Sequence, residues 1–399
     1  MSSGRGNPYP RYEAWRREGP LHRLAPEEMS PMMRVQGRMV FGGEIPPIFV
    51  AVTHEAVAEI LRDAERFSSS GYARTMGLVM GHTILEMDPP EHGRYRGLIQ
   101  QAFTRRALER WEHELVRPIV KRHVDAIAGR GRADLVRELT LPFPVAVIAG
   151  MIGVADRDLA SFHRFAVELI QISVDPARGV AASQSLRELF ARLLAERRAR
   201  PSDDLVGVLA RAELDGTRLD DESIYAFLRL LAPAGAETTY RSASNLLCGL
   251  LTHPDQLAAL RGDRGLVNDA IEEGLRWESP ITTIQRSCTR DTSVQGAEIP
   301  KGSLVVVSLG AANRDPARYE RPDAFDIRRP LKAHLSFAFG PHRCLGMHLA
   351  RIETRALLDA VLDRLPGLAL DPQAKPPEIT GLGFRSPPEL RVLFEADAP

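Results

Sequence analysis

The chain has 399 residues, and its 52 Lys and Arg residues balance its 52 Asp and Glu residues to a formal net charge of +0. This neutrality, with no run of one sign, argues against a nucleic-acid-binding or anionic-membrane surface. The 3 cysteines are too few for a disulfide framework, and no stretch approaches the roughly 18 uninterrupted apolar residues of a membrane span.

The domain organisation is predicted from what the sequence lacks. Length alone would allow two or three domains, but no Gly/Ser linker and no internal repeat divides the chain, so we expect a single domain over residues 1–399. Residues 1–8 lack the apolar core of a signal peptide. Together with the sparse cysteines, this predicts a cytoplasmic protein.

Helical periodicity dominates the sequence and predicts a mainly α fold with small β-sheets. Residues 186–194 place Leu and Phe on one helical face, with Arg and Glu on the other. The most apolar run, residues 143–154, is short and broken by glycine, which is typical of a buried core helix. Strands are predicted at residues 48–52, 304–309 and 390–394, the last as part of a late pair.

Two features lie between residues 68 and 96. Residues 68–86 interleave Met and aliphatic side chains with glycines, a composition that fits either core packing or a mobile lid. Pro90 is well placed to start a helix in which His92 and Arg96 fall at i and i+4 on one face. Two donors on one face can bind an anion; the alternative is that each is an ordinary surface side chain.

A helix predicted over residues 223–251 places an acid, Glu237, beside a hydroxyl, Thr238. These residue types can form a proton relay. The alternative is a hydroxyl returned to a carbonyl one turn back and a solvated carboxylate. Small residues at 234–236 would leave space beside the pair. Pro233 should kink the helix, because an internal proline costs roughly 3 kcal/mol.

One cysteine, Cys344, lies in a glycine-flanked turn directly before a helix predicted from Leu345 onward. As a thiolate it suits axial ligation of haem iron, which takes four ligands from the porphyrin and needs few from protein. Gly340 and Gly346 permit close backbone approach to a flat cofactor, and the helix N-terminus favours a negative sulfur. The alternative is a small buried hydrophobe.

Residues 337–346 resemble the cysteine-ligand loop of cytochrome P450 monooxygenases, with Ala338 where the family usually has glycine. Residues 231–239 resemble the family's Ala-Gly-x-Asp/Glu-Thr helix, residues 273–276 its Glu-x-x-Arg motif and residues 88–96 its His-x-x-x-Arg motif. The four motifs follow the family's order and spacing over nearly the whole chain. The resemblance therefore implies the cytochrome P450 fold with haem b.

The resemblance also assigns roles to single residues. It implies Thr238 as the oxygen-side alcohol and Glu237 as the acid that supplies it with protons. The residues that it assigns to the haem are Cys344 as the axial iron ligand, Phe337 and Gly346 beside the sulfur, and His92, Arg96, Arg286 and His342 at the propionates.

Taken alone, Glu273 and Arg276 are an i, i+3 pair worth roughly 0.2 to 0.5 kcal/mol at a helix surface. The resemblance instead implies a buried structural network under the haem. The family often adds an arginine before a later phenylalanine, where this chain has Ala324. Either Arg328 or Arg329 is therefore expected to substitute.

The function that the resemblance implies is insertion of one oxygen atom of O2 into a C–H bond. The substrate would be a medium-sized lipophilic molecule such as a terpenoid, steroid or polyketide, lined by residues 68–86, 281–284 and 381–384. Because the chain has no flavin or iron–sulfur module, electrons should come from a ferredoxin and its reductase. The expected docking face consists of Arg105, Arg106, Arg110, Arg343 and Arg351.

Two other functions compete with this interpretation. A peroxide-driven peroxygenase of the same fold would be expected to lack the Glu237–Thr238 pair, which this chain has. A haem-thiolate sensor or ligand-binding protein would need no proton relay and would usually carry a fused output region, which the sequence does not show. The pair favours the monooxygenase.

Overall fold

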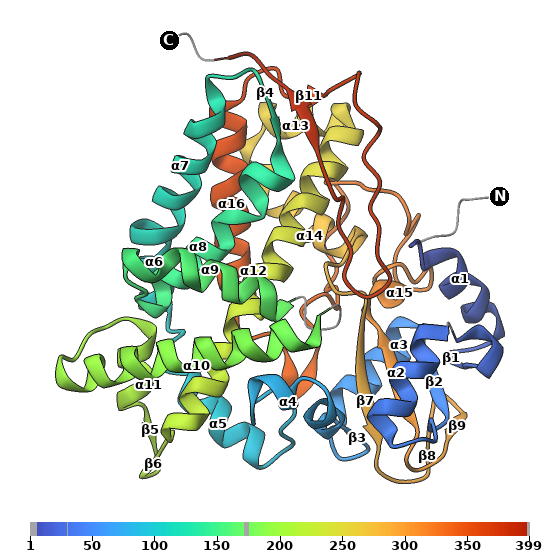
Figure 1. Cartoon of the computed structure of the whole chain (residues 1–399). Helices are drawn as coiled ribbons and strands as arrows, with labels where there is room; N and C mark the ends of the chain where they lie inside the picture. Colours follow the sequence, from blue (N-terminus) through green and yellow to red (C-terminus); the bar gives the residue numbers. More distant parts are fainter. Residues whose placement is uncertain (1–5, 30, 171–174, 397–399) are drawn as a thin grey trace.

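The computed structural model describes residues 6–29, 31–170 and 175–396. Helices form most of the molecule, and most of the strands gather on one side and at one end (Figure 1). The α-helices are α1 (Tyr9–Glu18), α2 (Pro31–Phe41), α3 (His54–Arg62), α4 (Gly77–Met80), α5 (Glu91–Gln100), α6 (Arg105–Trp111), α7 (Arg117–Ala128), α8 (Pro142–Ile152), α9 (Asp156–Ile170), α10 (Pro176–Ala199), α11 (Leu205–Arg211), α12 (Asp221–Thr252), α13 (Pro254–Gly262), α14 (Val267–Trp277), α15 (Leu309–Asn313) and α16 (Met347–Arg364).

Small sheets accompany these helices, as the sequence predicts, and the described residues form four of them. The largest has the order β1-β2-β10-β7-β3, in which only the β2–β10 pair is parallel. A second sheet has the order β11-β12-β4. The strands are β1 (Leu21–Arg23), β2 (Ile48–Ala51), β3 (Phe67–Ser68), β4 (Arg132–Asp134), β5 (Glu213–Leu214), β6 (Thr217–Arg218), β7 (Thr283–Cys288), β8 (Thr292–Val294), β9 (Ala297–Ile299), β10 (Leu304–Ser308), β11 (Ala369–Leu370) and β12 (Arg391–Leu393).

The three predicted strands are confirmed, with ends that differ by a residue or two. The late pair is β11 with β12, as expected, but β12 also pairs with β4, from the first half of the chain. Sequence periodicity cannot reveal this partner, because β4 has only three residues.

Helix α12 is the centre of the core and packs against α8, α10, α14 and α16. It begins at an Asp220 cap whose side chain accepts from the Ser223 amide, and it continues through Pro233 to Thr252. The helix predicted over residues 223–251 is thus confirmed, while the bend expected at Pro233 stays a prediction. Among the described residues, no helix combines the length and apolarity that crossing a bilayer demands.

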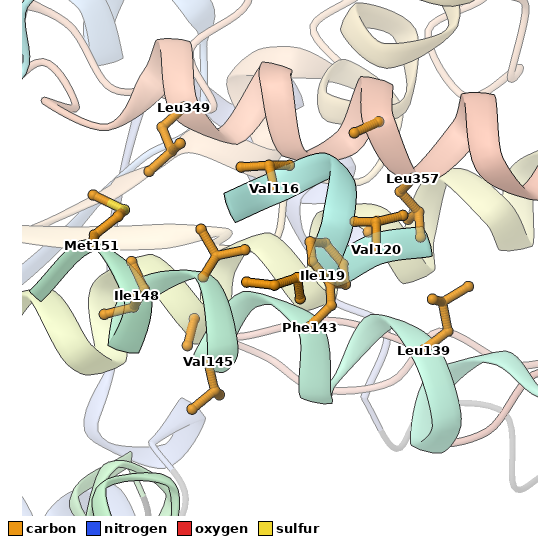
Figure 2. Close-up of a cluster of buried hydrophobic side chains, with 14 of the residues drawn as sticks. Val116, Ile119, Val120, Leu139, Phe143, Val145, Ile148, Met151, Leu349 and Leu357 are labelled. Carbon is orange, nitrogen blue, oxygen red and sulfur yellow. The ribbon is translucent and has the colours of Figure 1, made fainter. Parts of the chain in front are cut away.

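The apolar run at residues 143–154 forms α8, which is buried as predicted. Eight of its residues are buried, and it ends at Gly153, whose φ of 81° is left-handed. Figure 2 shows where α7, α8 and α16 meet: Val120, Phe143, Ile148 and Leu357 are among the clustered side chains. This cluster holds α16, and hence the turn before it, against the body of the protein.

Candidate functional site

The predicted cysteine turn lies directly before α16. A 3₁₀ turn, η7 (Gly340–His342), precedes Cys344, and the Cys344 amide donates to the Phe337 carbonyl at 2.9 Å. Gly340 has a φ of 72°, and a Cβ there would lie 2.3 Å from the Leu61 carbonyl oxygen. Only glycine fits this position, because both the backbone conformation and the contact exclude a side chain.

The departure from the family pattern at Ala338 has a local cost. Its φ of 54° is in the left-handed region, which glycine enters freely and which costs an alanine roughly 1 to 2 kcal/mol. The amide of Ala338 nevertheless donates to the Leu335 carbonyl at 2.9 Å, so the turn keeps its shape.

The thiol of Cys344 is solvent-accessible and has positively charged side chains near it. Cys344 is exposed, yet burial raises the pKa of its thiol, while the Gly346 backbone amide and the Arg96 guanidinium act to lower that pKa. A raised thiol pKa means that a positive metal centre would be needed to hold the thiolate.

The four side chains that the resemblance assigns to the haem propionates lie close together. The rings of His92 and His342 lie 4.1 Å apart, and an Arg96 terminal nitrogen donates to the Arg343 carbonyl at 2.6 Å. Burial, with positive charge on Arg286, His92 and Arg96 near it, lowers the pKa of His342 to about 3. We call His92, Arg96, Arg286 and His342 the donor cluster.

The donor cluster fits the carboxylates of haem. None of its four members forms an ion pair with a described carboxylate, and Nε2 of the buried His92 has no hydrogen-bond partner. Arg286 is 4 % exposed, and among the described residues its side chain bonds only to the Gln285 carbonyl. Buried donors of this kind need an acceptor, and a planar guanidinium is well matched to a carboxylate.

The surroundings of the thiol also fit a flat cofactor. A Cβ built on Gly346 would meet nothing within 4 Å, so the turn leaves room beside the sulfur. Among residues 6–29, 31–170 and 175–396, no group of three or more His, Cys, Asp or Glu side chains could hold a bare metal ion. Iron bound here would depend on ligands from a macrocycle, as in haem.

The acid and the alcohol on α12 do not contact each other. Thr238 Oγ1 donates to the Ala234 carbonyl at 2.7 Å, which is the back-bonded state that the sequence left open. Glu237 is 8 % exposed and therefore not solvated; burial raises the pKa of its carboxyl, which accepts from Arg241 at 2.8 Å. Arg241 also donates to Ser386.

The small residues next to this pair serve different purposes. A Cβ on Gly235 would lie 2.6 Å from Cδ1 of Ile148, so Gly235 allows α12 to pack on α8 and opens no space. Ala236 is buried as well, whereas Ala234 is exposed. The expected open space is thus restricted to Ala234.

The Glu273–Arg276 pair is buried, as the resemblance implies, and not a surface pair. The two side chains are 4 % and 3 % exposed, and they form two contacts of 2.7 Å. Arg329 approaches Glu273 at 3.3 Å and donates to the Ala324 carbonyl, whereas Arg328 is exposed. Of the two candidate substitutes, Arg329 completes the network.

The sequence patterns did not identify two further groups of interacting residues at this site. Glu272 accepts from Arg351 through two contacts of 2.6 and 2.8 Å and from His334 at 3.2 Å, and these partners lower the pKa of Glu272 to about 2 against the effect of burial. Arg351 also lies 4.6 Å over the ring of Phe337. This contact braces the aromatic side chain beside the thiolate turn.

The second missed group is a buried carboxyl on α16. Glu353 is 1 % exposed, accepts from Thr239 at 3.2 Å and has no partner for Oε1. Burial raises its pKa to about 8, so this carboxyl is largely protonated at neutral pH. The sequence gave no signal for this carboxyl, because a single acid in an amphipathic helix normally faces water.

The segments predicted to line a substrate pocket adjoin one another in part. Ile281 and Phe384 form an antiparallel bridge, which brings residues 281–284 and 381–384 together. Residues 68–86 contain η2 (Ser70–Arg74) and α4, and within them Met80 is buried while Leu78 is 78 % exposed. Residues 68–86 thus contain both a buried and an exposed apolar side chain.

Comparisons with known proteins agree with this geometry. The sequence model of the family described as Cytochrome P450 matches residues 138–393. The cytochrome P450 monooxygenase PikC of Streptomyces venezuelae is 37% identical over 378 residues, covering 92% of this chain and 85% of that protein. The steroid C26-monooxygenase of Mycolicibacterium smegmatis is 36% identical over 357 residues, covering 88% of each.

The fold agrees with solved structures as well. Cytochrome P450 CYP109Q5 from Chondromyces apiculatus superposes with a TM-score of 0.87 at 32% identity, covering 98% of this chain and 96% of that one. The match extends well beyond the residues of the family model. The chain therefore belongs to the cytochrome P450 family of haem b monooxygenases.

Proposed function

We propose that the protein hydroxylates a medium-sized lipophilic molecule, such as a terpenoid, steroid or polyketide, with electrons from a ferredoxin and its reductase. The observation that carries the proposal is the donor cluster beside Cys344, whose members have no carboxylate partner of their own among the described residues. Haem would supply those carboxylates and an iron for the thiolate.

Each site residue has one role in this proposal. Cys344 would ligate the iron, Phe337 would lie beside its sulfur, and the Gly346 amide hydrogen-bonds to that sulfur. The donor cluster would bind the two propionates. The planar guanidinium of an arginine is well matched to a carboxylate and would help to orient the cofactor.

When bound, haem supplies the oxygen-activating chemistry. The protein itself positions the substrate, excludes water and delivers protons. We assign Thr238 Oγ1 as the proton donor on the oxygen side and Glu237 as the acid that resupplies it. Arg241 orients the Glu237 carboxylate, and rotation of the Thr238 hydroxyl away from the Ala234 carbonyl makes its proton available.

Replacing Thr238 with Ala should uncouple electron consumption from hydroxylation. Without the Oγ1 proton donor, product formed per reducing equivalent should fall by about tenfold or more, since a positioned proton donor contributes factors of roughly 10² to 10⁴. The missing equivalents should leave as hydrogen peroxide. Parallel assays of product, peroxide and reductant measure the ratio.

The matched control is Thr252→Ala on the same helix. Thr252 Oγ1 also donates to a carbonyl one turn back, that of Cys248 at 2.7 Å, but it lies at the far end of α12. The control should leave coupling unchanged. Undiminished coupling in Thr238→Ala would contradict the assigned donor and would favour a ligand-binding or peroxide-driven protein.

The substrate class is inferred from the apolar lining of residues 68–86, 281–284 and 381–384. Leu382 and Phe384 are 59 % and 44 % exposed, so two large apolar side chains of these segments are free to contact a lipophilic ligand. A relative 36% identical to this chain is named for oxidation of a steroid. Both facts support a compact lipophilic substrate.

Of the five arginines expected at a ferredoxin-docking face, two have neither an ion-pair nor a hydrogen-bond partner for their side chains among the described residues. Arg351 is neutralised by Glu272, Arg105 pairs with Glu109, and Arg110 donates to the Asp203 carbonyl. By contrast, Arg106 and Arg343 are exposed and have no side-chain partner among the described residues. We therefore narrow the proposed docking face to these two, at the thiolate side.

Reversing both charges, Arg106→Glu with Arg343→Glu, should slow reduction by ferredoxin about tenfold or more at low salt, since steering raises association rates by 10- to 10³-fold. Stopped-flow reduction measured against ionic strength tests this, and the difference should shrink as salt rises. The control is Arg192→Glu, a charge reversal at an exposed residue of α10, which should leave the reduction rate unchanged. An unaltered rate in the double variant rejects this docking face.

We also propose that residues 1–399 are one domain and that the protein works in the cytoplasm. Sheet pairing supports the first proposal, because β2 pairs with β10 and β4 with β12, across most of the chain. The second is supported by three free cysteines, of which Cys248 and Cys288 are buried.

A further inference from the structure

A buried arginine on α12 has no function in the site described above. Arg229 lies two turns before the Glu237–Thr238 pair and is 9 % exposed. It is located where α12 meets α10 and α4, three helices in mutual contact (Figure 1). Helix α4 belongs to residues 68–86, the segment proposed to line the substrate pocket.

The guanidinium of Arg229 is held by neutral groups only. Its Nε donates to the Tyr225 carbonyl at 3.3 Å and one terminal nitrogen donates to Ser183 Oγ at 3.3 Å. The Ser183 hydroxyl in turn donates to the Val79 carbonyl of α4. In the part of the chain that the structure describes, the other terminal nitrogen has no hydrogen-bond partner and no carboxylate lies within ion-pair distance of the side chain.

Such an arrangement is costly unless something else supplies the negative charge. Arginine stays protonated in proteins, so burial leaves a charge that neutral acceptors compensate only in part. The nearest acid along α12, Glu222, is already paired with Arg187 at the surface. Burial accordingly lowers the pKa of Arg229.

The loop that follows α4 passes close to the terminal nitrogen of Arg229 that has no hydrogen-bond partner among the described residues. Gly81, with a φ of 85°, passes so close that a Cβ there would lie 3.0 Å from the second terminal nitrogen of Arg229. A side chain at position 81 would block that nitrogen. Glycine leaves it accessible from the side of the proposed pocket lining.

We propose that Arg229 is a specificity-determining residue that binds a carboxylate of the substrate, so that the substrate is a lipophilic monocarboxylate rather than a neutral lipid. This inference rests on the proposed function. Arg229 and Thr238 are nine positions apart, or roughly 13 Å along the helix at 1.5 Å per residue. The carboxylate would therefore lie at the end of the substrate remote from the carbon that is oxidised.

The test is a spectral titration of the haem-loaded protein with dodecanoic acid and with its methyl ester, at a pH where the acid is ionised. The acid should shift the iron spin state with a dissociation constant about ten to a hundred times lower than the ester, as expected for a charge-assisted hydrogen bond. Equal affinity of the acid and the ester in the wild-type protein would overturn the inference without any variant.

Variants then assign the preference to one side chain. Arg229→Gln should bring the affinities for acid and ester to within about a factor of two of each other, whereas Arg229→Lys keeps the charge and should retain most of the preference. Arg192→Gln, an equal charge change at an exposed position of α10, should alter neither affinity. Persistence of the full preference in Arg229→Gln would also refute the assignment.

Failure of this inference is distinguishable from failure of the proposed function. The reduced protein is first treated with carbon monoxide. Absence of the red-shifted Soret band in the wild type would refute the haem-thiolate site itself. A normal band together with equal binding of acid and ester would refute only the role of Arg229.

Discussion

Replacing Cys344 with Ser should abolish both the red-shifted Soret band of the reduced carbon monoxide complex and all measurable hydroxylation. A serine oxygen is not a thiolate, so the strong electron donation that promotes O–O cleavage is lost even if haem stays in place. The measurements are the difference spectrum and product formation with substrate. A variant that kept the red-shifted band would show that another group ligates the iron.

The other two cysteines provide matched controls for this substitution. Cys248 is buried in α12, and burial raises its thiol pKa to about 12. Cys288 is buried on β7 and its Sγ donates to the Arg290 carbonyl at 3.0 Å, a bond that a serine hydroxyl can replace. Cys288→Ser should therefore keep the red-shifted Soret band. Cys248→Ser should also keep this band, although it should lower the stability of the protein modestly.

Replacing Arg276 with Ala should have the largest effect on stability. Arg276 donates to Glu273 and to the carbonyls of Asn313, Pro322 and Ala324, in bonds that are buried or partly buried. Its removal takes from the buried Glu273 carboxylate its two closest donors and from the Asn313 and Pro322 carbonyls their arginine donor, and breaking a buried pair in this way costs roughly 3 to 5 kcal/mol. We expect the free energy of unfolding in urea to fall by that amount and haem content to fall with it.

The control for this substitution is an arginine in an exposed ion pair. Arg105 and Glu109 form an i, i+4 contact at 2.8 Å on the surface of α6. Arg105→Ala should give the same urea midpoint as the unmodified protein, because exposed pairs contribute little. A similar small effect in Arg276→Ala would mean that the network is not the structural support assigned to it.

The sequence predicted the elements that depend on local patterns. The helix at residues 223–251, the buried helix at residues 143–154 and the three strands were found by periodicity, which acts within a single element. The partner of β12 could not be found this way. Strand β4 has only three residues, and its pairing with β12 depends on how the whole chain folds rather than on a local sequence pattern.

The same distinction applies to the site. His92, Arg96 and His342 were assigned through motifs, and the structure brings them together. The contact of Glu272 with Arg351 was missed because it joins residues 79 positions apart on two helices that are each unremarkable alone. Arg351 was assigned to a docking face from its charge alone, whereas the structure pairs that charge with Glu272.

The role of Gly235 was also misread, for a related reason. A run of small residues next to an acid and an alcohol predicts open space, but smallness also permits close packing of helices. Which of the two applies depends on the neighbouring helix, and here Ile148 of α8 occupies the volume beside Gly235. The sequence of α12 alone contains no information about that neighbour.

The parallel pairing of β2 with β10 bears on when the protein can acquire its cofactor during biosynthesis. Ile48 lies opposite Leu304, and the adjacent strand β7 carries Arg286, so a nascent chain on the ribosome cannot close this sheet until most of it has emerged. Contacts of such high contact order form slowly. We therefore expect haem to bind after translation. Before that, the early helices should form a partly folded intermediate that the final strands complete.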